Sequence, residues 1–204
     1  MRVRSFGANG LLLEVDDPAG WFAELNRRRA AGELAAVEIV PGARTVLLDG
    51  VPDAAATTER LRGWTLPEAE PTAAIENAVE IPVDFDGPDL DAVAARWHTD
   101  VRGVIDRLTA TQLRVAFCGF SPGFAYLGGL PDELAVPRLS TPRTRVPPGS
   151  VGLADIYAGI YPTASPGGWH LIGRTDITLF DPDHDPPALL SPGTPVRFIE
   201  RARP

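Results

Sequence analysis

The chain contains no lysine, a single cysteine and three histidines. Without lysine it cannot form a Schiff base or present the lysine of a P-loop. Any bound anion must therefore be held by arginine guanidinium groups and backbone N–H groups. One cysteine excludes an internal disulfide, and so few thiol and imidazole ligands predict no metal site of the usual kind. A GC-rich genome would also explain the use of arginine in place of lysine.

Long apolar runs are missing as well. No stretch approaches the ~18 consecutive apolar residues of a membrane span, and the first residues are not followed by an apolar signal-peptide core. The net charge is −8 and the arginines are interspersed with acidic residues, which argues against a general nucleic-acid binder. We therefore expect a cytoplasmic protein that binds neither membranes nor nucleic acids.

The pattern of the first half predicts a small α/β domain. The 204 residues, 44% of them hydrophobic, suffice for two small folded domains. Strand-like runs and helical segments alternate here, with strands at 2–6, 11–15, 37–40, 45–48 and 78–83 and helices at 18–31 and 52–63. Taking the first two runs as one strand region, this order predicts a ferredoxin-like βαββαβ domain over residues 1–80.

The second half has a different texture. Two short helices are expected at 88–97 and 100–108, after the junction at 84–88. From residue 113 onward, short apolar runs alternate with Gly/Pro turns, at 113–118, 170–173, 177–180 and 195–199. Short strands with frequent turns predict a compact β-barrel or sandwich over residues 81–204. The whole chain is therefore expected to be an α+β protein.

Four Gly- and Pro-rich segments in this half have the composition of an anion site, at 119–130, 137–152, 159–162 and 165–175. Glycine lets the backbone approach a ligand closely, and proline stiffens the loop beforehand. Arg138, Arg143, Arg145 and Arg174 offer bidentate donors for carboxylate or phosphate. The pattern predicts a site for a small polar anion or a phosphorylated intermediate, although the same segments could be β-turns with aromatic side chains in the core.

From these segments we select candidate residues for two roles. Those expected to act on the substrate are Arg143, Arg145, Ser150 and Arg174. Those expected to bind it are Phe120, Tyr126, Tyr161, Ser165, Gly168, Trp169 and His170. His170 could also serve as a general acid or base. No metal ligand is assigned.

Other chemically suggestive residues are expected to be structural. His98 lies near a helix end, His184 lies in an acidic turn, and Cys118 ends an apolar strand. Asp176 is close enough in sequence to pair with Arg174. The Gly-x-Ser-x-Gly pattern at 119–123 contains a proline and a glycine after the serine, and a nucleophile elbow must continue directly into a helix. A serine hydrolase triad is therefore not expected.

A resemblance to a known family is carried by residues 119–130, 141–152, 159–162 and 165–175, together with 180–182 and 187–193. The sequence resembles the B subunit of 5-oxoprolinase, also labelled allophanate hydrolase subunit 1, carboxyltransferase subdomain, or KipI-type kinase inhibitor. The resemblance implies a small N-terminal α/β domain followed by a cyclophilin-like β-barrel. It also implies pairing with the C subunit, a cyclophilin-like sister, and joint ATP-dependent hydrolysis of 5-oxo-L-proline to L-glutamate with the A subunit, the single chain being inactive alone.

On this resemblance, Arg143, Arg145 and Arg174 would neutralise a substrate carboxylate or developing phosphate charge. Ser150, Tyr161 and Ser165 would orient the substrate, with Trp169 as a wall. Whether ATP touches this chain stays open. Two alternatives belong to the same family: a carboxyltransferase subunit of a biotin-dependent urea or allophanate system, and a KipI-like inhibitor of a histidine kinase. Members usually carry a histidine where this chain has Leu108.

Overall fold

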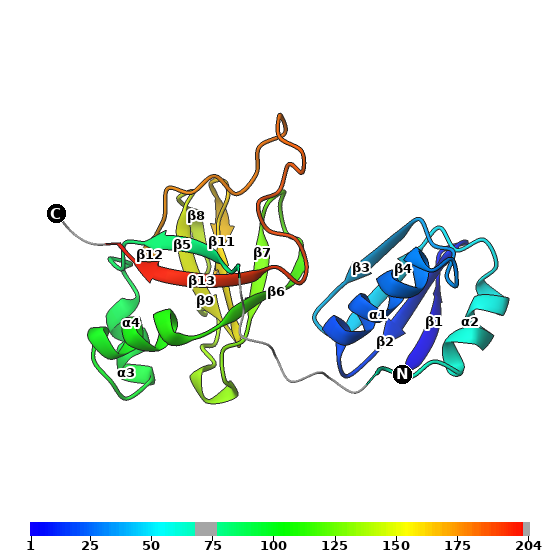
Figure 1. Cartoon of the computed structure of the whole chain (residues 1–204). Helices are drawn as coiled ribbons and strands as arrows, with labels where there is room; N and C mark the ends of the chain where they lie inside the picture. Colours follow the sequence, from blue (N-terminus) through cyan, green and yellow to red (C-terminus); the bar gives the residue numbers. More distant parts are fainter. Residues whose placement is uncertain (68–76, 202–204) are drawn as a thin grey trace. The chain divides into compact units, whose positions relative to one another are not determined.

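The computed structural model describes residues 1–67 and 77–201. The chain divides into two compact units, Met1–Ala74 and Ile75–Pro204. Figure 1 shows that each unit has its own sheet and its own helices. Among the described residues, no helix combines the length and apolar character that crossing a membrane requires. The expectation of a mixed α+β protein is confirmed.

The first unit is a four-stranded antiparallel sheet with two helices (Figure 1). In sheet order its strands are β1 (Arg2–Phe6), β2 (Gly10–Glu14), β4 (Thr45–Asp49) and β3 (Glu38–Pro41). The helices are α1 (Pro18–Ala30) and α2 (Ala54–Arg62). Apolar side chains from the sheet and from both helices form one core, which includes Leu13, Leu25, Val46 and Leu61.

Local sequence signals fix both ends of α1. The Asp17 carboxylate accepts a hydrogen bond from the Gly20 N–H at 2.8 Å, and Pro18 occupies the first helical position. Asp17 thereby satisfies one of the N–H groups that a helix start leaves unpaired. Gly32 follows the helix with a φ of +74°, a left-handed conformation that glycine adopts without a Cβ penalty. The sequence predicted both of these ends.

A buried carboxylate lies on the inner side of α1. Glu24 is only 5% exposed, and it accepts hydrogen bonds from Arg27 Nε at 2.8 Å and Arg28 Nε at 2.6 Å. The hydrogen bond from Arg27, with that from Arg28, lowers the pKa of Glu24 from 4.5 to about 2 against the opposing effect of burial. This carboxylate therefore stays charged in mild acid.

Because its folded-state pKa lies below its unfolded value, Glu24 stabilises the first unit fully above pH 4.5 and loses this effect as the pH falls toward 2. We expect Glu24→Gln to lower the free energy of unfolding at neutral pH by about 1.5–3 kcal/mol. The same change should flatten the acid limb of the stability curve. Urea unfolding at several pH values, followed by the methyl NMR resonances of Leu25, measures both effects.

Glu59→Gln is the matched control. Glu59 pairs with Arg62 on the exposed face of α2, so its removal should change the free energy of unfolding by less than about 1 kcal/mol. A Glu24→Gln protein that keeps the wild-type acid limb would show that Glu24 does not govern it.

The second unit is built on a seven-stranded sheet with the order β12-β9-β10-β7-β6-β13-β5 (Figure 1). The strands are β5 (Val79–Val83), β6 (Leu113–Cys118), β7 (Ala125–Gly128), β9 (Ser150–Ala154), β10 (Tyr157–Ile160), β12 (His170–Arg174) and β13 (Pro195–Glu200). A two-stranded ladder joins β8 (Arg143–Val146) to β11 (Ser165–Gly167). The remaining elements are α3 (Leu90–Arg96), α4 (Val101–Ala110) and the 3-10 turn η1 (Asp132–Leu134).

The edge strands of this sheet, β5 and β12, are joined by the residues that follow β5. Asp84 and Arg174 form an antiparallel bridge, with backbone N–O distances of 2.8 and 3.0 Å. Beyond it, the Asp89 N–H donates to the Leu171 carbonyl at 3.0 Å. The close approach requires glycine at 87, where a Cβ would lie 2.3 Å from the Leu171 carbonyl oxygen. The sheet is therefore a nearly closed barrel.

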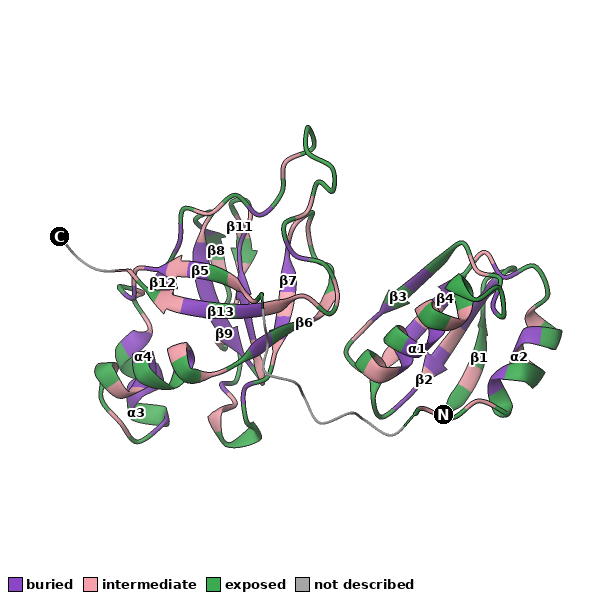
Figure 2. Ribbon diagram, viewed as in Figure 1, coloured by how far each residue is buried: buried purple, intermediate pink, exposed green. Residues whose placement is uncertain are grey.

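One apolar core is shared by the barrel strands and by α3 and α4, as the buried residues in Figure 2 indicate. Trp97, after α3, is buried there and its indole N–H donates to the Leu134 carbonyl at 3.0 Å. The Asp100 carboxylate caps α4 by accepting from the Gly103 N–H at 2.8 Å, as predicted. Leu108 is completely buried in this core. This position therefore presents no polar group to a ligand.

Two features of the fold differ from the sequence expectations. The strand predicted at 78–83 does not complete the first sheet, because β5 pairs in parallel with β13 of the second unit. The first unit thus has the order ββαββα in place of βαββαβ. The boundary predicted between residues 80 and 81 falls inside β5. The apolar run at 177–180 forms no strand, and only Phe180 makes a bridge, to Ala188.

Candidate functional site

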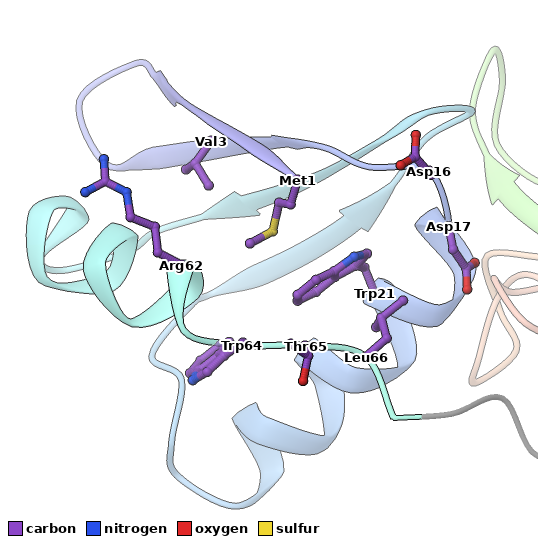
Figure 3. Close-up of a pocket in the computed structure, with 9 residues that line it drawn as sticks. All are labelled: Met1, Val3, Asp16, Asp17, Trp21, Arg62, Trp64, Thr65 and Leu66. Atoms are coloured by element: carbon purple, nitrogen blue, oxygen red, sulfur yellow. The ribbon is translucent and has the colours of Figure 1, made fainter.

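A cavity of about 530 Å³ lies in the first unit, between β1 and the segment that follows α2. Figure 3 shows its lining: Met1, Val3, Asp16, Asp17, Trp21, Arg62, Trp64, Thr65 and Leu66. The Asp17 carboxylate is already used as the cap of α1, and Arg62 pairs with Glu59. None of the site residues selected from the sequence lies here, so this cavity is not the predicted anion site.

A second cavity, of about 260 Å³, lies in the second unit. All four segments selected from the sequence contribute to its lining, and the segment at 137–152 contributes Arg138 and Pro142. The residues are Phe120, Phe124, Tyr126, Arg138, Pro142, Tyr161, Pro166, Gly167, Gly168 and Trp169. Five of them belong to the predicted substrate-binding set. We take this aromatic cavity as the candidate functional site.

Aromatic rings that pack edge to face form the walls of the aromatic cavity. The Phe124 ring centroid lies 5.1 Å from that of Tyr126 and 5.4 Å from that of Tyr161, both edge to face. It also lies 5.5 Å from the Trp169 ring at an interplanar angle of 87°. Edge-to-face packing of this kind fixes ring orientation as well as burying apolar area. The cavity therefore offers flat, rigid, apolar walls.

Glycines make room for these rings. A Cβ on Gly167 would lie 2.4 Å from the Tyr161 hydroxyl oxygen, and one on Gly159 would lie 2.9 Å from the Trp169 ring. Gly168 also lines the cavity, and its carbonyl accepts a hydrogen bond from the Leu139 N–H at 2.8 Å. The glycine-rich composition that marked these segments in the sequence thus serves close packing around the cavity.

Phe120 stands out at the mouth of the cavity. It is 60% exposed, and its φ of +72° is a left-handed conformation that is uncommon for a bulky residue. Its ring contacts Phe124 edge to face at 5.3 Å. Strained backbone of this kind tends to occur at functional sites, where the surrounding structure maintains it. Phe120 is thus placed to contact a molecule entering the cavity.

Tyr161 contributes the polar group at the floor. The residue is 2% exposed, and burial raises the pKa of its phenol. The Trp169 backbone and the positive charges of Arg138 and Arg143 act in the opposite direction. The phenol stays protonated at neutral pH, and Tyr161 lines the cavity together with Arg138.

Arg143, which the sequence placed among the groups acting on the substrate, is engaged elsewhere. Its Nη2 lies 2.8 and 2.9 Å from the two carboxylate oxygens of Asp89. Asp89 also accepts from the Leu171 N–H at 2.7 Å, and Arg143 Nη1 donates to the Trp169 carbonyl at 3.3 Å. Arg143 therefore holds the chain behind the cavity wall and does not line the cavity.

The other three residues expected to act on the substrate lie neither with Arg143 nor in the aromatic cavity. Arg174 pairs with Asp86 on the surface, with Nε 3.0 Å from Oδ2. Arg145 is exposed, and Ser150 is buried in β9. None of the three lines the aromatic cavity. The expected pairing of Asp176 with Arg174 is not found, because Asp176 pairs with Arg201.

Three polar atoms beside the cavity residues are buried without a hydrogen-bond partner in the described part of the chain: Ser121 Oγ, Ser165 Oγ and His170 Nδ1. Each belongs to a residue adjacent to one that lines the cavity, namely Phe120, Pro166 or Trp169. Such atoms are few in folded proteins and each calls for a physical reason. Ser165 and His170 are thus near the cavity, but do not line it.

The remaining chemical candidates lie outside the aromatic cavity, and Cys118, which the sequence placed in the core, is exposed. The Cys118 thiol lies 3.7 Å from the Leu190 carbonyl oxygen, and partial burial raises its pKa, so it is a poor nucleophile. His184 pairs with Asp181 in the acidic turn at 2.8 Å. The pattern at 119–123 leads from one strand into a turn, not into a helix. Within residues 1–67 and 77–201, no group of three acidic, histidine or cysteine side chains could hold a metal ion.

Five cavity residues were not selected from the sequence, among them Phe124 and Arg138. Phe124 is both buried and part of the cavity wall. Arg138 carried the same sequence signal as the other arginines of its segment. Only the tertiary structure separates them, because Arg143 pairs with Asp89 and Arg145 does not line the cavity.

Comparison with known proteins gives a consistent relationship. The family model described as "Carboxyltransferase domain, subdomain C and D" matches residues 1–190. The B subunit of 5-oxoprolinase from Escherichia coli O157:H7 is 40% identical over 204 residues, which cover 95% of this chain and 93% of that protein. The B subunit of 5-oxoprolinase from Bacillus subtilis (strain 168) is 46% identical over 124 residues, or 59% of this chain and 52% of that protein.

Among solved structures, that of TTHA0988 in space group P212121 is similar, with a TM-score of 0.76 and 34% identity. The match covers 100% of this chain but only 41% of the TTHA0988 chain, so this chain spans less than half of that longer relative. The family model and the 40% identity over almost the full length point to the same relationship. The chain belongs to the family of the carboxyltransferase domain, subdomains C and D.

Proposed function

We propose that this chain is the B subunit of an ATP-dependent 5-oxoprolinase, which hydrolyses 5-oxo-L-proline to L-glutamate together with the A and C subunits. The observation that carries the proposal is the 40% identity to a 5-oxoprolinase B subunit over 95% of the chain. The nearly closed seven-stranded barrel supports assignment of the second unit to the cyclophilin-like architecture implied by the resemblance.

The chemistry explains the need for ATP. A lactam carbonyl is a poor electrophile, so transfer of the γ-phosphoryl group of ATP to the amide oxygen, with release of ADP, prepares the ring for attack. One water molecule then adds to that carbon, and cleavage of the C–N bond leaves γ-glutamyl phosphate. A second water molecule converts this phosphate to L-glutamate and inorganic phosphate. The aromatic cavity, with its flat walls and about 260 Å³ of space, suits a five-membered lactam.

The complex is expected to be required for turnover. This chain has no lysine, so it cannot supply the P-loop lysine that commonly holds ATP. The cavity also opens at the exposed ring of Phe120, which leaves room for a partner chain to cover it. We place ATP use in the assembled trio, in the cytoplasm.

Reconstitution tests the proposal. This chain, co-expressed with A and C subunits of 5-oxoprolinase from the same genome, should release L-glutamate and ADP from 5-oxo-L-proline and ATP. We expect the isolated chain to release neither product above the buffer rate. The measurement is glutamate by amino-acid analysis and ADP by a coupled assay, with omission of each component of the trio in turn as the control. A purified trio that turns over no 5-oxo-L-proline would refute the proposed function.

A second candidate is favoured by the description of the matching family, which names a carboxyltransferase domain. In that case the chain would transfer a carboxyl group from carboxybiotin, held by a partner, to an amide nitrogen such as that of urea. A neighbouring biotin carboxylase gene would favour this function, and a neighbouring gene for the A subunit would favour the first. Biotin-dependent incorporation of labelled bicarbonate in the presence of urea would establish it directly.

A further inference from the structure

The second unit leaves two arginines without a hydrogen bond or ion pair within residues 77–201, Arg138 and Arg145. Other arginine side chains of this unit donate to described partners, namely Arg96, Arg102, Arg107, Arg114, Arg143, Arg174, Arg197 and Arg201. Of the two, Arg138 lines the aromatic cavity and Arg145 does not. The cavity therefore contains one guanidinium group whose donors are available to a ligand.

The backbone on both sides of Arg138 is fixed. Val136 forms an antiparallel bridge with Asp155, and the Val136 N–H donates to the Asp155 carbonyl at 2.9 Å. On the other side, the Leu139 N–H donates to the Gly168 carbonyl at 2.8 Å. The segment that carries Arg138 is thus anchored to the loop after β9 and to the cavity wall. Such anchoring reduces the ordering cost when the arginine binds a ligand.

The groups that line the cavity with Arg138 define the kind of ligand. Arg138 and Tyr161 both line this cavity. Rings of Phe124, Tyr126 and Trp169 form the remaining walls. A cavity of about 260 Å³ with flat apolar walls and one cation at its edge matches a compact, flat ring that carries a carboxylate.

We propose that Arg138 binds the substrate carboxylate and thereby determines specificity for carboxylated lactams. This inference rests on the proposed function, and it replaces Arg143, Arg145 and Arg174 in that role. Arg143 and Arg174 are excluded by their pairing with Asp89 and Asp86, and Arg145 by its position outside the cavity. Tyr161, which lines the same cavity, offers its hydroxyl as a donor for a second ligand oxygen.

The test compares two substrates on the reconstituted trio: 5-oxo-L-proline, and 2-pyrrolidinone, which is the same lactam without the carboxylate. For Arg138→Ala we expect kcat/KM toward 5-oxo-L-proline to fall by about 10- to 150-fold, the loss of a hydrogen bond to a charged group. Most of the loss should appear in KM. Turnover of 2-pyrrolidinone, which has no carboxylate to lose, should change less than about twofold. Arg138→Lys should recover part of the loss, because lysine restores the positive charge but not the bidentate donor geometry of a guanidinium group.

The matched control is Arg44→Ala, which removes an exposed arginine from the first unit. Within residues 1–67 and 77–201 its side chain has no hydrogen-bond or ion-pair partner, so both substrates should react at wild-type rates. An Arg138→Ala trio that keeps its KM for 5-oxo-L-proline would overturn the inference. Equal losses on both substrates would also overturn it, since they would indicate a merely structural role.

Binding to the same trio separates failure of this inference from failure of the proposed function. Saturation-transfer NMR with 5-oxo-L-proline should give a signal with the wild-type trio and with Arg44→Ala, and a much weaker one with Arg138→Ala. If the trio has no 5-oxoprolinase activity, the proposed function fails, and this binding comparison still decides the role of Arg138. An absent wild-type signal, or an unchanged one in Arg138→Ala, counts against that role.

Discussion

Replacement of Phe124 by alanine is expected to lower the free energy of unfolding of the second unit by about 3–5 kcal/mol, the usual cost of removing a buried aromatic ring. Phe124 is 2% exposed, and its ring contacts those of Phe120, Tyr126, Tyr161 and Trp169. Neighbouring rings are too rigid to close the space that it leaves. The aromatic cavity should enlarge and lose its ordered walls, so turnover by the trio should fall as well.

Native-state hydrogen exchange measures this change for each unit separately, because core amides report the opening of their own unit. Amides of β6, β7 and β9 should exchange faster in Phe124→Ala, and amides of β2 and β4 should keep their wild-type rates. Phe6→Ala is the control, because Phe6 is a phenylalanine that is 54% exposed in the first unit and should cost about 0.5 kcal/mol or less. A change of under about 1 kcal/mol in Phe124→Ala would show that the cluster can repack around the gap.

Removal of the Asp89 carboxylate is expected to have the second-largest effect. Its side chain is 13% exposed, and it accepts two hydrogen bonds from Arg143 Nη2 and one from the Leu171 N–H. Asp89→Ala leaves a partly buried guanidinium and a backbone donor unpaired. Because Arg143 is 28% exposed and keeps some solvent, we expect a loss of about 2–3 kcal/mol in the free energy of unfolding.

The barrel provides a matched comparison for Asp89. Asp86 pairs with Arg174 at the same closure of the sheet, but these two side chains are 39% and 67% exposed. Asp86→Ala should therefore cost no more than about 1 kcal/mol. Double-mutant cycles for Asp89 with Arg143 and for Asp86 with Arg174, followed by hydrogen exchange of β9 and β12, give the two coupling energies. Equal coupling in the two pairs would contradict the role assigned to Asp89.

Much of the fold could be predicted because its signals are local. Asp17, Pro18 and Asp100 mark helix starts by groups that act within one turn, and the strands up to β4 follow from alternation between turn residues. The placement of β5 could not be predicted in this way. Its apolar residues suit either sheet, and its partner β13 lies at the other end of the unit. Pairing between such distant segments leaves no trace in the local pattern.

The candidate site, too, could be predicted only in part from the sequence. The residue types that form the aromatic cavity were visible in the sequence, and five of the selected residues line it. What the sequence could not supply was the partner of each arginine. Arg143 and Arg138 lie five positions apart on similar Pro-rich backbone, yet the first is held by an aspartate from a distant segment and the second is not. Only the tertiary structure distinguishes an arginine used for stability from one available to a ligand.

The pairing of β5 with β13 also has a consequence for synthesis on the ribosome. The first strand of the barrel forms its parallel ladder with the last one, from Val79 opposite Val196 to Val83 opposite Glu200. While the chain emerges, the edges of β5 and β6 that pair with β13 stay unpaired until β13 has left the exit tunnel. The first unit, whose sheet is complete once β4 is made, is free to fold long before. Nascent chains halted before β13 should therefore hold a finished first unit and an unfinished barrel that depends on chaperones.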